Sequence, residues 1–168
     1  MFQNYITKII NASELEKIYD KKIAQNPADI HIPEQKKRRM KDAIAGTKVF
    51  FGGFIDDELI CEANATVSAD DAHVQNKDYV LSGNTAYLSA FLTKEPYRQK
   101  GYFSKLYAFM ENELRSMGFE HLTIGVEPED EKNRLMYYKW GYTELIYSGV
   151  EEFDDMKIRV CYYRKNLK

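Results

Sequence analysis

The sequence predicts a single α+β domain over residues 1–168, with a central mixed sheet of six to seven strands and helices on both faces. The composition is that of a globular protein, with 44% hydrophobic and 30% charged residues, and the length suits one domain. Strand-like and helix-like segments alternate without repeats or low-complexity linkers. A helix between two strands requires a crossover, so the middle strands should be parallel and the outer hairpins antiparallel.

Two helices are expected near the N-terminus. The segment Ser13-Glu14-Leu15-Glu16 has the spacing of a capping box, and apolar residues follow it at helical intervals. Pro33 suits the first turn of a second helix, which should end near Gly46.

A hairpin and a long loop should come next. Apolar runs over residues 49–55 and 59–67 flank Asp56-Asp57, a pattern typical of two strands joined by a tight turn. The polar segment 68–84 predicts a loop, and loops of this length are often functional.

The second half alternates strands and helices. Gly118 and Gly141 suit left-handed residues at the ends of two helices, and Asp154-Asp155 suits the turn of a final hairpin. The expected strands are residues 86–93, 121–126, 143–153 and 157–164, and the expected helices are residues 101–117 and 133–140.

Composition also limits the function. The net charge of −2 argues against a general nucleic-acid or anionic-membrane binder, and the longest apolar run is too short to span a bilayer. No secretory signal is visible, and only two cysteines, Cys61 and Cys161, lie in apolar runs. We therefore expect free thiols in a cytoplasmic protein.

No metal site or nucleic-acid patch is expected. His31, His73 and His121 are far apart and lack partners at metal-ligand spacing. The basic run over residues 36–41 is interpreted as a solvated helix face.

The most informative segment is the turn over residues 98–104, between a strand and an amphipathic helix. The first N–H groups of a helix lack intrahelical acceptors, and the helix dipole adds positive potential. A pyrophosphate fits there, with Gly101 allowing close approach and Arg98 and Lys100 adding charge. An ordinary basic turn remains the alternative. Fingerprints for nicotinamide or nucleotide-triphosphate sites are absent.

Two blocks of sequence resemble the GNAT superfamily of N-acetyltransferases. Residues 87–102 resemble its acetyl-CoA-binding segment, whose motif is Gln/Arg-x-x-Gly-x-Gly/Ala; Arg98 and Gly101 match, whereas Phe103 departs from the third position. Residues 125–142 resemble its second segment, Leu-Tyr-x-x-x-Gly-Phe, in which Tyr137 and Gly141 match.

The resemblance implies a GNAT-like fold with a splayed parallel strand pair, and acetyl-CoA as cosubstrate without a metal. It places the pantetheine arm along the main chain of Phe91, Leu92 and Thr93. It implies that Tyr137 protonates the leaving thiolate, although an aromatic core stripe is the alternative. The remaining cofactor contacts that it implies come from the turn and the following helices: Arg98, Gln99, Lys100, Gly101, Tyr102, Phe103, Ser104 and Asn133.

Direct attack requires a neutral amine. A lysine-like amine has a pKa near 10.4, so neutralising it at pH 7 costs about 4–5 kcal/mol, and a carboxylate can remove that proton. Glu127 is the first candidate base, because strand alternation places it with Thr123 and Gly125. A surface or capping carboxylate is the alternative, and Glu62 is a second candidate base.

Acidic residues are expected at the open end of the sheet, which favours a cationic acceptor such as a polyamine, an aminoglycoside or a basic peptide end. Ordinary solvated loop charges are the alternative. These residues are Asp70, Asp71, Glu127, Glu129, Asp130 and Glu131.

The favoured hypothesis is an N-acetyltransferase acting on a small-molecule or peptide amine; an acyltransferase for longer acyl groups is a close variant. The competing hypothesis is a degenerate module that binds acyl-CoA or a protein partner without catalysis. Phe103 favours that module, whereas Tyr137 favours the enzyme. A homodimer is a further partner that we consider.

Overall fold

The computed structural model describes residues 2, 4–153 and 155–168, so residues 1 and 3 and half of the expected Asp154-Asp155 turn lie outside the described residues. The helices are α1 (Ala12–Gln25), α2 (His31–Ala45), α3 (Tyr102–Ser116) and α4 (Glu131–Lys139), with a short 3₁₀ turn at Glu95–Tyr97. The strands are β1 (Tyr5–Ile10), β2 (Lys48–Ile55), β3 (Glu58–Thr66), β4 (Thr85–Thr93), β5 (His121–Val126), β6 (Glu144–Phe153) and β7 (Met156–Asn166).

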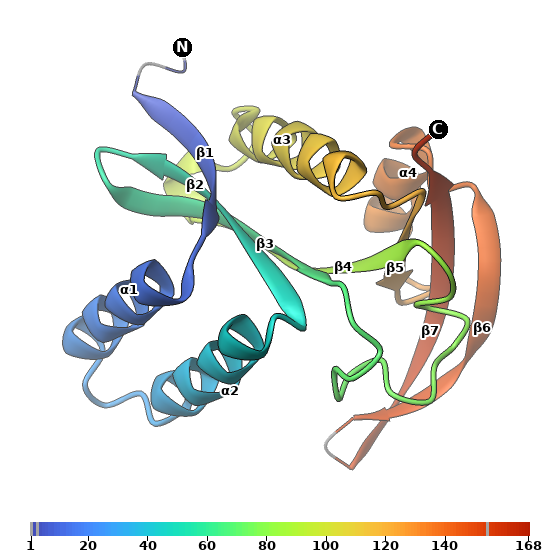
Figure 1. The fold of residues 1–168 in the computed structure, drawn as a ribbon, viewed down its shortest axis with the longest axis horizontal. Coiled ribbons are helices and arrows are strands. Elements are labelled where there is room, and N and C mark those ends of the chain that lie inside the picture. Colours follow the sequence, from blue (N-terminus) through green and yellow to red (C-terminus); the bar gives the residue numbers. More distant parts are fainter. Residues whose placement is uncertain (1, 3, 154) are drawn as a thin grey trace.

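The seven strands form one mixed sheet in the order β1-β2-β3-β4-β5-β7-β6 (Figure 1). The central neighbours β4 and β5 are parallel, and the hairpins on either side are antiparallel. This arrangement confirms the predicted fold class. Sequence reasoning missed β1, an edge strand that pairs with β2 from Tyr5↔Ile55 to Ile10↔Phe50.

Both faces of the sheet are covered by helices (Figure 1). On one face Phe50 and Phe54 pack with Tyr19 and other residues of α1 and α2. On the other face Phe51 packs with Leu106 and further apolar side chains of α3. Since strand side chains alternate between faces, β2 anchors both layers at once. Each buried aromatic or leucine side chain contributes about 1.5–3 kcal/mol.

Left-handed residues end the elements where the sequence predicted them. Gly46, Gly118 and Gly141 have φ angles of +71°, +94° and +100° just beyond α2, α3 and α4. Asp56 and Asp57 have φ angles of +47° and +63°, which fits a tight hairpin turn between β2 and β3. No helix among the described residues is long and apolar enough to cross a membrane.

The predicted cap of the first helix is wrong. The cap is Asn11, whose Oδ1 accepts the Glu14 N–H at 2.8 Å, and the helix begins at Ala12. Ser13 lies inside the helix, so its capping-box spacing is coincidental. The chain that enters from β1 begins the helix two residues earlier than that spacing predicts.

Replacing Asn11 should therefore weaken the fold. Asn11→Ala should lower the free energy of unfolding by about 0.5–2 kcal/mol, since the first turn loses a side-chain acceptor. Urea unfolding would measure this loss. Ser13→Ala is the matched control and should stay within about 0.5 kcal/mol of the wild type; a larger loss at Ser13 than at Asn11 would contradict this assignment.

Candidate active site

A bulge in β4 opens the centre of the sheet. Ser89 pairs with Asn64 of β3, but the next matched pair is Leu92 with Glu62, so one extra residue is inserted in β4. Ala90 lies within it at φ +56°. Pairing between β4 and β5 ends at Leu88↔Ile124.

Beyond that point the two parallel strands diverge. Gly125 and Val126 continue β5 by pairing with β7, not with β4. A cavity of about 340 Å³, here called the strand gap, lies between the strands. It is lined by Tyr87, Leu88, Ser89, Ala90, Phe91, Ile124, Gly125 and Tyr137. The structure thus has the splayed parallel pair that the resemblance implies.

The basic turn after β4 leads into α3 as expected. Gln99 and Gly101 have φ angles of +59° and +83°, and Gly101 is the N-cap. No side chain caps α3, and its first turn carries no acidic residue. By contrast, Asn11 and Asp130 cap α1 and α4. Uncapped N–H groups at a helix start are suited to an anion such as a pyrophosphate.

The basic side chains of this turn donate hydrogen bonds to nearby main-chain carbonyls and so stabilise the turn. Arg98 Nε donates to the Thr93 carbonyl at 2.9 Å, and Lys100 Nζ donates to the Pro96 carbonyl at 2.8 Å. The Tyr102 carbonyl accepts the hydroxyl of Tyr5 at 2.9 Å. Gln99 and Ser104 are exposed. The main chain, more than the basic side chains, is therefore presented to a ligand.

Phe103, which departs from the family motif, fills space between α3 and α4. Its ring centroid lies 5.0 Å from that of Phe91 and 6.1 Å from that of Trp140, stacked at 16°. The residue therefore belongs to an aromatic cluster beside the strand gap.

Tyr137 lies on the wall of the strand gap. Its ring meets Phe91 edge-on at 6.3 Å. Within the described residues no side-chain hydrogen bond acts on its hydroxyl. Burial, and then the charge of Asp130, raises the pKa of this phenol above its usual value. Tyr138 points away, as expected, and is 62% exposed.

Glu127 and Asn133 adjoin Tyr137 in a second hollow of about 280 Å³, here called the α4 hollow. Glu127 is exposed just beyond β5. Asn133 Nδ2 donates to Asp130 at 2.6 Å, so its side chain serves the cap of α4. The structure thus brings together Glu127, Asn133 and Tyr137.

The second candidate base lies elsewhere. Glu62 forms ion pairs with Arg39 at 3.2 Å and Lys22 at 3.5 Å, between α1, α2 and the sheet. Each oxygen of its carboxylate is thus held by a cation. Glu62 lines neither the strand gap nor the α4 hollow.

Sequence reasoning missed two residues of the α4 hollow. Glu151 accepts hydrogen bonds from Tyr162 at 2.8 Å, Lys77 at 2.9 Å and Tyr79 at 3.1 Å. Tyr87 lines both this hollow and the strand gap, and burial, followed by the charge of Glu151, raises its pKa to about 12. Alternation along β4 could have flagged Tyr87, but no local pattern marks Glu151.

A third cavity of about 450 Å³ lies between α2 and the loop 68–84, and we call it the α2 cavity. Arg38, Arg39 and Lys41 line it. Lys37, Arg38 and Lys41 are exposed, as the interpretation of residues 36–41 as a solvated helix face predicts, and part of that face borders this cavity. Tyr87, Ser89 and Ala90 line both this cavity and the strand gap. The loop thus helps to form a site.

The expected acidic cluster is divided among structural roles. Asp71 pairs with Lys48 at 3.0 Å, Glu129 pairs with Arg159 at 2.6 Å, and Asp130 caps α4. Both cysteines are free and buried, as predicted. No group of three potential metal ligands occurs among the described residues.

Comparison with protein families identifies the class. The model of the acetyltransferase (GNAT) family matches residues 15–142, so the chain belongs to that family. No curated protein matches the sequence.

Solved structures share the fold at low identity. An N-acetyltransferase from Staphylococcus aureus Mu50 superposes with a TM-score of 0.65 at 14% identity, covering 99% of this chain and 100% of its own. The PaiA N-acetyltransferase from Thermoplasma acidophilum, in complex with coenzyme A, gives 0.57 at 16%, covering 96% and 98%. A spermidine N-acetyltransferase SpeG chimera, from Vibrio cholerae and hSSAT, gives 0.67 at 14%, covering 98% and 96%.

The raised pKa of Tyr87 predicts a pH effect. An unfolded tyrosine loses its proton near pH 10, whereas Tyr87 keeps it to about pH 12, so its contribution to stability is complete below pH 10 and is lost between pH 10 and 12. The free energy of unfolding should therefore fall less between pH 9 and 11 in Tyr87→Phe than in the wild type, as measured in urea. Identical falls would contradict the assigned shift.

Proposed function

We propose that residues 1–168 form a single acetyltransferase domain that transfers the acetyl group of acetyl-CoA to a primary amine by direct attack. One observation carries the proposal: the unpartnered hydroxyl of Tyr137 lies on the strand gap that the bulge at Ala90 opens. Family membership and the complex of PaiA with coenzyme A support the choice of cosubstrate.

The chain has main-chain groups suited to an extended cosubstrate. The β5-facing edge of β4 is released after Leu88, and beyond that point we assign the pantetheine arm to the main chain of Phe91, Leu92 and Thr93, as the family resemblance implies. The left-handed Gln99 and Gly101 turn the chain so that the uncapped start of α3 can receive phosphates. Acetyl-CoA supplies an electrophilic thioester carbonyl and a thiolate leaving group.

Tyr137 supplies a proton on the leaving-group side. A thiol has a reference pKa near 8.5, so a departing thiolate at pH 7 gains from a nearby donor. The raised pKa keeps the Tyr137 phenol protonated throughout the neutral range. Its freedom from protein hydrogen bonds leaves the hydroxyl available.

Glu127 is the proposed base, acting directly or through one water. Its carboxylate lies at the edge of the α4 hollow that Tyr137 also lines. Among the described residues it forms no ion pair, in contrast to Glu62 with its two cations. Glu151 is a weaker candidate, because three donors already occupy its carboxylate.

The second candidate function is a non-catalytic acyl-CoA-binding module. Phe103 favours it, because a bulky ring stands where the family motif has a small residue. The packing of that ring against Phe91 and Trp140 gives it a structural role that is compatible with catalysis.

Cosubstrate binding can be tested at Gly101. Gly101→Glu adds a carboxylate at the proposed phosphate site and forces a side chain to adopt φ +83°, so it should weaken acetyl-CoA binding by well over tenfold. Gly118→Glu is a matched control at the other end of α3, with φ +94° and open space around it. Calorimetry measures the affinity of both folded variants for acetyl-CoA. An unchanged affinity in Gly101→Glu would refute the proposed site.

Catalysis can be tested by thiol release from acetyl-CoA with a panel of amines, polyamines, aminoglycosides and peptide N-termini. Tyr137→Phe should lower kcat by about 10²–10³ with little change in cosubstrate affinity, because only the proton donor is lost. Tyr138→Phe is the control and should be much milder. Equal effects at both positions, or no thiol release while acetyl-CoA binds, would favour the non-catalytic module.

A further inference from the structure

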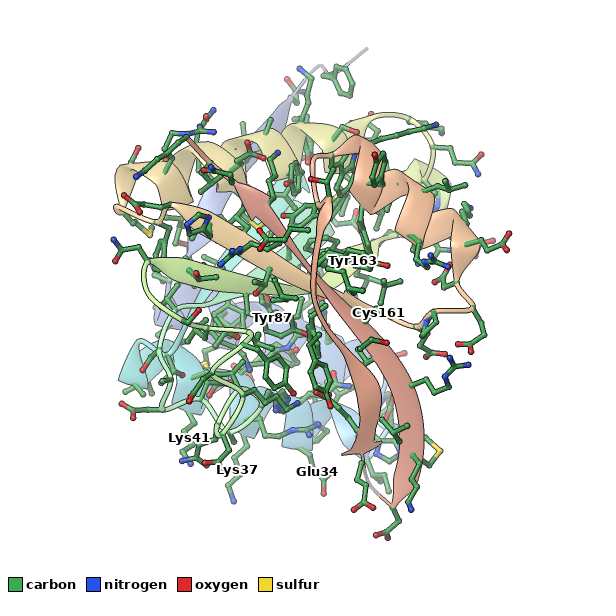
Figure 2. The ribbon with its side chains drawn as sticks, turned by 90° about the vertical axis from the view of Figure 1, so that its right-hand side faces the viewer. Glu34, Lys37, Lys41, Tyr87, Cys161 and Tyr163 are labelled. Carbon is green, nitrogen blue, oxygen red and sulfur yellow. The ribbon has the colours of Figure 1, made fainter. Side chains whose placement is uncertain are left out.

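The α2 cavity is placed to receive the acceptor. It meets the strand gap at Tyr87, Ser89 and Ala90, so a molecule in it would reach the point where the two parallel strands part. Its floor also includes Asn64 and Thr66 of β3. In Figure 2, α2 runs along the lower side, with Lys41, Lys37 and Glu34 labelled, and Tyr87 lies above it.

The charged lining of this cavity is mainly basic. Five cationic side chains line it, against two carboxylates, Asp42 and Asp71. Lys48 bridges both carboxylates, at 3.3 Å from Asp42 and 3.0 Å from Asp71, so neither is left to hold a cationic ligand. The five cations are Arg38, Arg39, Lys41, Lys48 and Lys77.

Positive charge remains after the neighbouring ion pairs are counted. Arg39 pairs with Glu62, and Lys77 pairs with Glu151, which raises the count to four carboxylates against the same five cations. Among the described residues neither Arg38 nor Lys41 forms an ion pair, although both lie on the cavity side of α2. The surplus is therefore located on α2, at the outer end of the cavity.

The floor carries a second, independent sign of a ligand. The Thr66 hydroxyl is fully buried and has no hydrogen-bond partner among the described residues. Buried polar groups are nearly always paired, with protein, water or ligand. Thr66 belongs to the cavity lining together with Asn64 and Ser89, so the floor offers polar partners to a bound molecule.

We propose that the acceptor is an amine that also bears an anionic group, a carboxylate or a phosphate, which Arg38 and Lys41 bind at the outer end of the α2 cavity. The amine then lies at the inner end, beside Tyr87 and Ser89. This inference rests on the proposed acetyltransferase function and names its acceptor class. It replaces the cationic acceptor expected from the sequence, because three of the six carboxylates behind that expectation, Asp71, Glu129 and Asp130, are used in ion pairs and a helix cap.

The test compares acceptors that differ only in charge. For chains of two to six carbons, thiol release from acetyl-CoA is measured with the ω-amino carboxylate, its neutral amide and the diamine, and with the aminoalkyl phosphate. The best anionic acceptor should exceed its amide and its diamine at least about tenfold in kcat/KM, since charge-assisted hydrogen bonds are strong. The carboxylate and phosphate arms identify which anion is bound.

Reversing one charge should reverse the preference. Arg38→Glu should lower kcat/KM for the best anionic acceptor at least about tenfold and raise it for the matching diamine. Lys37→Glu makes the same charge change on the same helix without lining the cavity, so it should leave the ratio within about twofold.

The failures of the two proposals are distinguishable. A wild-type preference for diamines, or equal effects of the Arg38 and Lys37 variants, would overturn the anionic acceptor while leaving the acetyltransferase intact. If acetyl-CoA binds but no amine releases thiol, the enzyme proposal fails. Calorimetry with the amino carboxylates then tests whether the α2 cavity binds an anionic group. Binding lost in Arg38→Glu would support an anion site, and absent or unchanged binding would overturn it.

Discussion

The rest of the site depends on one backbone constraint, the bulge that rotates β4 away from β5. A non-glycine residue in the left-handed region costs about 1–2 kcal/mol, and Ala90 adopts it within a strand. The cost is offset because pairing with β3 resumes at Leu92, and because the Phe91 ring packs against Phe103 and Trp140. Without the extra residue, β4 could remain paired to β5 and the strand gap would close.

The aromatic cluster beside the strand gap gives that opening a fixed shape. Tyr107 and Trp140 stack at 4.5 Å, and the Tyr107 and Tyr142 hydroxyls lie 3.0 Å apart. Such pairs contribute about 0.5–1.5 kcal/mol each beyond burial, and here they join α3 to α4. Phe103 belongs to the same contact, which explains why a large residue is tolerated where the family has a small one. The cluster holds Tyr137 against the gap.

The sequence predicted what local chemistry encodes, including the hairpin at Asp56-Asp57 and the glycine ends of the helices. It did not reveal the bulge, because Ala90 carries no signature of a left-handed residue. It misplaced the cap of α1 because two nearby segments offered similar spacing. Charged residues can be counted in the sequence, but their ion pairs cannot be predicted from it. Only the fold shows that Glu62 forms an ion pair with Arg39.

The contrast between features that the fold fixes and side chains that it leaves free indicates which residues should select the acceptor. The strands, the bulge and the start of α3 are constrained by the fold and by the cosubstrate that the family shares. The exposed side chains of Arg38 and Lys41 on α2 meet no such constraint, because among the described residues they form no ion pair and take no part in the core clusters. The SpeG chimera is a spermidine N-acetyltransferase of similar fold at 14% identity, and that likeness extends to the fold alone. A helix presenting Arg38 and Lys41 can therefore select an amine that bears an anionic group while the opening at Ala90 stays the same.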